Sequence, residues 1–234
     1  MITISHVTKK YGNKKALDDV SFEVSGGEIF AFIGHNGAGK TTLIKSIVGI
    51  HDFDEGEILI DGKSIKKEPV ECKEIMAYVP DNPELYENMK ALDFINFICD
   101  MYDVDLKIRE KNIKKYAEMF EMTENLGNEI KSFSHGMKQK VALIAALAHD
   151  PKVLIMDEPF VGLDPKAIFD MKEVMRDMAK HGKTIFFSTH ILDVAEKLCD
   201  RVAIVKKGQI VKVGTMKSVK GDKSLEKVFL ELEK

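Results

Sequence analysis

The chain has 234 residues, of which 44% are hydrophobic and 31% charged, a balance typical of a globular protein with enough apolar side chain for a core. Its 35 lysine and arginine residues against 38 acidic ones give a formal net charge of −3, which excludes a general basic surface for nucleic acid. The longest apolar run, 141–148, is far shorter than the roughly 18 residues of a membrane span. The first residues lack the apolar stretch of a secretory signal, and three scattered cysteines in no CxxC spacing indicate reduced thiols. We therefore expect a cytosolic protein.

The first third of the chain combines strands with one helix. Its opening alternates apolar and polar residues as β-strands do. The apolar run 29–33, bounded by glycines, predicts a buried parallel strand, and 41–49 after a glycine-rich turn predicts a helix. A further strand over 57–60 ends at Asp61-Gly62, which is a hairpin turn signal.

The remaining two thirds divide at a proline. Residues 81–149 carry apolar side chains at helical spacing between many charges, which predicts a helical insertion ending at Asp150-Pro151. Short apolar strands follow at 153–156, 184–187 and 202–205, and the last residues predict an amphipathic helix. Strand–helix–strand repetition predicts an α/β fold with a mostly parallel sheet, whose ligands bind beyond the carboxyl ends of the strands.

The segment from Gly34 to Thr41 matches the phosphate-loop pattern GxxxxGK[ST], which occurs by chance in about 1% of chains of this length. Glycines let backbone N–H groups converge on phosphate oxygens, and the helix N-terminus adds unsatisfied N–H groups. Lys40 would neutralise phosphate charge and the Thr41 hydroxyl would bind Mg²⁺. The alternative is a glycine turn with a solvated lysine. The loop predicts phosphoryl chemistry without specifying its kind, since kinases, GTPases and ATPases share it. The predicted nucleotide-binding residues here are Gly34, Asn36, Gly37, Ala38, Gly39, Lys40, Thr41 and Thr42.

Polar residues follow two of the predicted strands. Asp157 and Glu158 end the strand at 153–156, where Asp157 is expected to hold Mg²⁺ and Glu158 to orient or deprotonate the attacking water. One of the pair could instead cap a helix or form a salt bridge. His190 ends the strand at 184–187 and is predicted to hydrogen-bond the γ-phosphate, although a lone histidine is usually structural.

A second candidate anion site lies at Ser132–Lys140, where Ser134 and Gly136 precede an apolar helical stretch. A Ser-x-Gly at a helix entrance can present N–H groups to an anion, or it can be a plain N-cap. The two helix-entrance sites either converge on one nucleotide within the chain or each serve a nucleotide held mainly by a partner.

Five segments, in this order along the chain, resemble the motifs of the ATP-binding-cassette (ABC) ATPases: the phosphate loop, FSHGMKQK, VLIMDE, VGLD and STH. FSHGM stands where that family has LSGGQ. The resemblance implies a phosphate-loop NTPase (RecA-like) core with an N-terminal antiparallel β subdomain. It also implies one ABC ATPase domain over 1–234, with 1–80 and 150–220 as the core, 81–149 as the helical subdomain and 221–234 as a C-terminal helix.

The resemblance further implies a head-to-tail dimer that encloses two ATP molecules with Mg²⁺. Ser134, His135 and Gly136 would then face the partner's ATP, and Asp164 would act across the interface. Tyr11 would stack on adenine, its alternative being a surface aromatic at a strand end.

The sequence departs from the family pattern at three positions. Asp81 stands after the Tyr-x-Pro strand end where glutamine is usual; it is assigned to the Mg²⁺ shell, its alternative being a turn residue. His135 replaces the first signature glycine and Met137 the glutamine. The run SHGMKQK resembles exporter subgroups in which ATPase and permease are separate chains.

These observations predict an ATPase subunit that powers a membrane transporter, with export expected from the subgroup. It would be cytoplasmic and peripheral on the cytoplasmic face of the membrane through a permease, whose helix would dock at 81–91, near Leu85, Tyr86 and Met89. The alternatives are a small-molecule kinase, a soluble ABC-type ATPase of DNA repair or translation, and a catalytically silent ATP clamp. The presence of Glu158 argues against the last of these.

Overall fold

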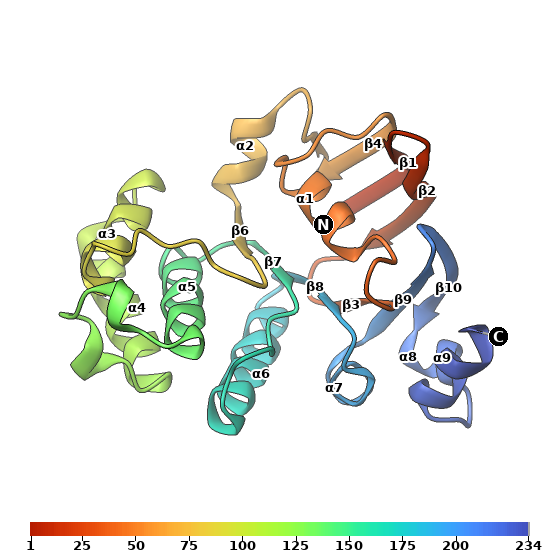
Figure 1. The fold of residues 1–234 in the computed structure, drawn as a ribbon. Helices are drawn as coiled ribbons and strands as arrows, with labels where there is room; N and C mark the ends of the chain where they lie inside the picture. Colours follow the sequence, from red (N-terminus) through yellow and green to blue (C-terminus); the bar gives the residue numbers. More distant parts are fainter. Residues whose placement is uncertain (234) are drawn as a thin grey trace.

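The computed structural model describes residues 1–233 (Figure 1) and contains two β-sheets. The N-terminal sheet has the strand order β2-β1-β4-β5, in which every neighbouring pair is antiparallel. Its strands are β1 (Ile2–Tyr11), β2 (Lys14–Val24), β4 (Glu55–Ile60) and β5 (Lys63–Ser64). The turn predicted at Asp61-Gly62 joins β4 to β5.

The second sheet has six strands in the order β10-β9-β3-β8-β7-β6, and all neighbours are parallel except β10 and β9. The strands are β3 (Ile29–Ile33), β6 (Met76–Val79), β7 (Val153–Asp157), β8 (Thr184–Thr189), β9 (Arg201–Lys206) and β10 (Gln209–Thr215). The mostly parallel sheet and the antiparallel N-terminal sheet expected from the sequence are therefore confirmed.

Helices connect these strands. They are α1 (Lys40–Ile47), α2 (Pro69–Glu74), α3 (Ala91–Met101), α4 (Leu106–Met119), α5 (His135–Ala148), α6 (Pro165–Lys180), α7 (Leu192–Leu198), α8 (Met216–Lys220) and α9 (Leu225–Glu233), with short 3₁₀ turns at Thr123–Asn125 and Ile130–Ser132. In the described part of the chain, no helix combines the length and apolarity that crossing a bilayer requires.

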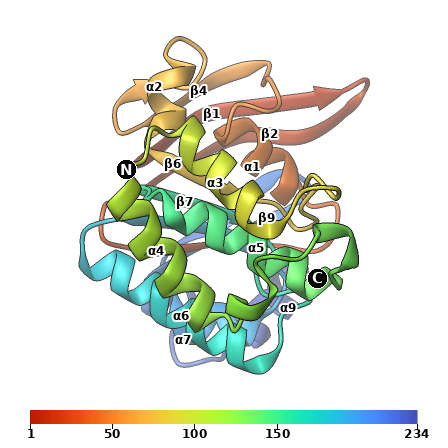
Figure 2. The same cartoon turned by 90° about the vertical axis from the view of Figure 1, so that its left-hand side faces the viewer.

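The six-stranded sheet is apolar on both faces because it is covered on both. Alternate residues of β3 belong to different apolar clusters: Phe30 and Phe32 pack with α1 and the antiparallel sheet, whereas Ala31 and Ile33 pack with the other helices. Figures 1 and 2 accordingly place the antiparallel sheet on one side of this sheet and α6 and α7 on the other. Phe22 of β2 stacks on Phe30, with ring centroids 5.1 Å apart, and so joins the two sheets.

The predicted helical insertion contains α3, α4 and α5, which lie side by side in both views (Figures 1 and 2). Its first ten residues, 81–90, are not helical. Asn82 precedes Pro83, and a residue before proline is driven out of the α region. The carbonyl oxygens of Glu87 and Met89 instead accept hydrogen bonds from the backbone N–H groups of Lys131 and Ile130. The first helix of the insertion begins at Ala91. At the other end of the chain, α9 packs on the phosphate loop, where the Phe229 and His35 rings are 4.8 Å apart.

Candidate nucleotide site

The phosphate loop connects the end of β3 to the start of α1, as the motif requires. Gly39, the residue before α1, has φ +109°, and a Cβ there would lie 2.4 Å from the carbonyl oxygen of Ala16, so only glycine fits. The Lys40 Nζ donates a hydrogen bond of 2.8 Å to the carbonyl oxygen of Gly34, which folds the side chain back over the loop. The loop and the Lys40 side chain thus line the same space.

That space is a cavity of about 410 Å³. It is lined by Tyr11, Lys14, Ala16, Asn36, Gly37, Gly39, Lys40, Thr41, Thr42, Asp81 and Glu158. Most of these residues are predicted site residues. Lys14 and Ala16 are not; they come from the start of β2, and only their closeness to Tyr11 in the sequence hints at a role.

Asp157 and Glu158 occupy different environments. Asp157 is the last residue of β7, is 2% exposed, and accepts a hydrogen bond from the hydroxyl of Ser188 on β8. Glu158 leaves the strand in the left-handed conformation, at φ +47°. The two carboxylates therefore differ in position because the backbone turns at Glu158, and not because successive residues of one strand point to opposite faces of the sheet.

The backbone of Glu158 is anchored by Ser188. Its N–H donates to the hydroxyl of that serine at 3.1 Å. A strained dihedral persists only where the surroundings enforce it, and such residues cluster at functional sites. Ser188 was not singled out from the sequence, although it begins the STH segment, because its partners come from another strand.

The carboxylate of Glu158 joins the phosphate loop to His190. One oxygen lies 3.2 Å from the Nζ of Lys40, and the other lies 2.9 Å from the Nδ1 of His190. The backbone N–H of His190 also donates to this second oxygen, at 3.2 Å. Glu158 and Lys40 are nearly buried, so the pair is poorly screened by solvent. His190, predicted to meet a phosphate, here holds the carboxylate.

Asp81 follows β6 and lines the same cavity. Burial raises the pKa of its carboxyl, and the nearby charges of Asp157 and Glu158 raise it further. In the part of the chain that the structure covers, no three His, Cys, Asp or Glu side chains are grouped to hold a metal ion.

Tyr11 ends β1, lines the cavity and is 47% exposed as a residue. Its hydroxyl is hydrogen-bonded to the Nδ1 of His51 at 2.9 Å. The sequence does not single out His51, because that residue lies beyond the helix that follows the phosphate loop.

The residues of the second candidate anion site do not line this cavity. Ser134 caps α5, where its hydroxyl accepts a hydrogen bond of 3.3 Å from the N–H of Met137. His135 covers Gly162, since a Cβ on Gly162 would meet the imidazole at 2.6 Å. Asp164 caps α6 and pairs with Lys140 of α5 at 2.7 Å. Residues 134–136 are absent from the described lining of the cavity.

The chain was compared with known proteins. The ABC transporter family model matches residues 17–161. YhcH of Bacillus subtilis (strain 168), an uncharacterized ABC transporter ATP-binding protein, is 33% identical over 234 residues, 100% of this chain and 75% of its own. EcsA of that strain, an ABC-type transporter ATP-binding protein, is 34% identical over 239 residues, 100% and 97% of the two chains. LnrL of the same strain, a linearmycin resistance ATP-binding protein, is 34% identical over 215 residues, which are 92% of this chain and 69% of its own.

Solved structures agree with the sequence comparisons. An ATP-binding subunit of an ABC transporter superposes over 100% of both chains with a TM-score of 0.96 and 33% identity. The cassette MJ0796, a dimer in a post-hydrolysis state with ADP and Pi, covers 92% of this chain and 99% of its own with a TM-score of 0.83 and 25% identity. The chain therefore belongs to the ABC transporter family, as an ATP-binding subunit whose nucleotide-binding cassette hydrolyses ATP.

Proposed function

We propose that this subunit hydrolyses Mg·ATP at sites shared between two head-to-tail cassettes and thereby powers transport through a separate permease. One observation carries the shared site: Ser134 and its loop lie outside the cavity that Lys40 and Glu158 line. Each chain would then contribute the phosphate loop of one site and the signature of the other, which favours the second of the two arrangements left open by the sequence.

Within the proposed site, the residues divide the chemistry between them. Lys40 and the loop N–H groups hold the β- and γ-phosphates, and Glu158 takes a proton from the attacking water. His190 keeps that carboxylate oriented through its two contacts. Ser134 and Gly136 of the second chain contact the γ-phosphate.

The Mg²⁺ would be held by Thr41, Asp157 and Asp81. Mg²⁺ prefers oxygen ligands and is usually bound through one or two carboxylates together with phosphate oxygens. Asp157 fits this chemistry because its buried carboxylate is oriented by the Ser188 hydroxyl. Bound Mg²⁺ would supply neutralisation of the charge on the phosphate oxygens.

Complementation between two inactive variants tests the shared site. Lys40→Ala removes the phosphate contact of one half and Ser134→Arg blocks the other. In a head-to-tail dimer, a mixed pair restores one intact site, so an equal mixture regains about a quarter of wild-type ATPase activity after subunit exchange. A site built within one chain leaves the mixture as inactive as its parts.

Phosphate release without a phosphorylated acceptor excludes the kinase alternative, and loss of turnover in Glu158→Gln excludes the silent clamp.

A groove beside the helical layer supports docking of a permease helix. The groove has a volume of about 260 Å³ and is lined by Ala77, Tyr78, Pro80, Pro83, Glu84, Leu85, Phe94, Ile98, Tyr102, Ala142, Ala145, Ala146 and His149. Tyr86, which follows the lining residue Leu85 in the chain, is 59% exposed and meets Phe97 with ring centroids 5.8 Å apart. Of the three predicted docking residues, Leu85 and Met89 are half-buried against the core, and Tyr86 is the one that offers an exposed apolar surface.

The docking test uses the ATPase together with its permease. Tyr86→Ser with Phe97→Ser should lower recovery of the subunit with the permease in membranes, while ATP hydrolysis by the free subunit stays unchanged. Retention at the wild-type level would place the permease elsewhere.

Export is proposed from the SHGMKQK resemblance and the resistance function named for LnrL. ATP-driven uptake into inside-out vesicles checks the direction.

A further inference from the structure

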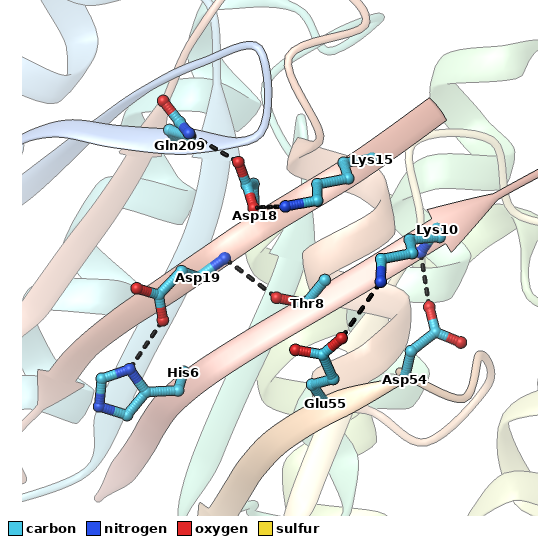
Figure 3. Close-up of polar contacts among 9 residues, drawn as sticks. All are labelled: His6, Thr8, Lys10, Lys15, Asp18, Asp19, Asp54, Glu55 and Gln209. Carbon is cyan, nitrogen blue, oxygen red and sulfur yellow. Dashed lines mark hydrogen bonds and ion pairs between the residues drawn. The ribbon is translucent and has the colours of Figure 1, made fainter. Parts of the chain in front are cut away.

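The loop after α1 closes over the end of β1, where Tyr11 stands. In Figure 3 the backbone N–H of Lys10 donates to the carboxylate of Asp54 at 2.6 Å, and the Lys10 ammonium pairs with Glu55 at 3.2 Å. In return, the N–H of Asp54 donates to the carbonyl oxygen of Thr8 at 2.8 Å. The strand end and the loop thus hold each other in register, and the ring of Tyr11 projects from a fixed backbone.

The ring itself is held by His51. The Tyr11 hydroxyl is hydrogen-bonded to the imidazole at 2.9 Å, and the two rings meet edge to face, with centroids 6.3 Å apart. Nearly half of the Tyr11 surface is exposed, so packing alone leaves the ring freedom to rotate. The contact with His51 removes part of that freedom before a ligand arrives.

His51 is in turn tied to the helix that carries the phosphate loop. Its backbone N–H donates to the carbonyl oxygen of Lys45, in the last turn of α1, at 3.0 Å. Lys40 and Thr41 stand at the opposite end of this helix and line the cavity, as Tyr11 does, whereas His51 is not among the described residues that line it. One short helix therefore connects the group that orients the Tyr11 ring to the groups that bind phosphate.

We propose that His51 is a positioning residue for the nucleotide base: it fixes the Tyr11 ring at a set distance from the phosphate loop, so that base and phosphates bind together. This inference rests on the proposed contact between Tyr11 and adenine. His51 acts only through Tyr11, so it contributes to binding of ligands that have a base and not to binding of phosphate chains that lack one.

Titration calorimetry of the full chain with ATP and with inorganic tripolyphosphate tests this proposal. His51→Ala and Tyr11→Phe remove the same hydrogen bond, so each should weaken ATP binding by about 3- to 10-fold. The double variant should be no weaker than either single one, and tripolyphosphate affinity should not change. His51→Gln, which can still bond the hydroxyl, should retain most of the ATP affinity. The control is His6→Ala, which removes an exposed histidine of β1 that pairs with Asp19 at 2.7 Å (Figure 3).

The outcomes separate this proposal from the function on which it rests. If Tyr11→Ala leaves ATP affinity unchanged, the adenine contact itself is wrong. If Tyr11→Ala weakens ATP binding while His51→Ala and Tyr11→Phe do not, the adenine contact stands and positioning by His51 is refuted. Equal losses of ATP and tripolyphosphate in His51→Ala would also refute it, since they would show a disturbed phosphate loop.

Discussion

The energy of the contact between His135 and Gly162 can be measured by comparing two glycines. They share a backbone conformation but have different surroundings. Gly162 and Gly182 have φ +79° and +80°. A Cβ on Gly182 would meet no atom within 4 Å, whereas a Cβ on Gly162 would lie 2.6 Å from the Cδ2 of His135. Both alanine substitutions strain the backbone, but only Gly162→Ala also collides with an imidazole.

The magnitudes follow from these two effects. A left-handed alanine costs about 1–2 kcal/mol, so Gly182→Ala should lower the free energy of unfolding by that amount. Gly162→Ala should lose about 1 kcal/mol more, because the ring must move off its position. For a chain of this size the extra loss corresponds to a decrease in melting temperature of about 2–4 °C.

Urea unfolding followed by circular dichroism measures these free energies. In a His135→Ala background the collision is gone, so the cost of Gly162→Ala should fall to that of Gly182→Ala, with a coupling energy of about 1 kcal/mol between the two sites. Equal costs for both glycines in the wild-type background would show that the imidazole does not pack on Gly162. A cost at Gly162 that persists without the imidazole would assign it to another neighbour.

Three further predictions concern single groups. Burial lowers the pKa of His149 to about 4 from its ordinary value of 6.5, so the neutral imidazole of the folded chain stabilises it fully above pH 6.5. Between pH 6.5 and 5 this stabilisation should fall by at most about 2 kcal/mol, and His149→Phe should remove that slope in urea titrations. Asp81→Asn removes a carboxylate from the cavity and should tighten binding of metal-free ATP by about 2- to 5-fold in calorimetry with EDTA at low salt, and by less at high salt. Asp164→Ala removes both an N-cap and an ion pair and should lower the free energy of unfolding by about 1 kcal/mol more than Lys140→Met, which removes only the pair.

The local parts of the site could be predicted from the sequence. The phosphate loop, Asp157 and Glu158 each follow a buried apolar strand, and the strand order of the fold brings the ends of β3, β7 and β8 together. The capping role of Ser134 is equally local, since its partner Met137 is three residues away. These contacts depend on residue type and short spacing, which the sequence displays directly.

The contacts that join distant segments could not be predicted. The bonds of Ser188 to Asp157 and of His51 to Tyr11 depend on the register of neighbouring strands and on the path of a loop. No periodicity in the sequence reports either of them. Strand β10 was also missed, although its residues alternate between exposed and half-buried as an edge strand should, a signal that the sequence contains.

The ammonium of Lys40 already has partners within the chain. The Nζ of Lys40 lies within 3.2 Å of Glu158 and bonds the Gly34 carbonyl oxygen as well. Phosphate oxygens that bind Lys40 in the proposed site would compete with Glu158 for this cation. Binding of the nucleotide would thus free the Glu158 carboxylate from Lys40, so the residue proposed to activate water would become available only when a triphosphate is present.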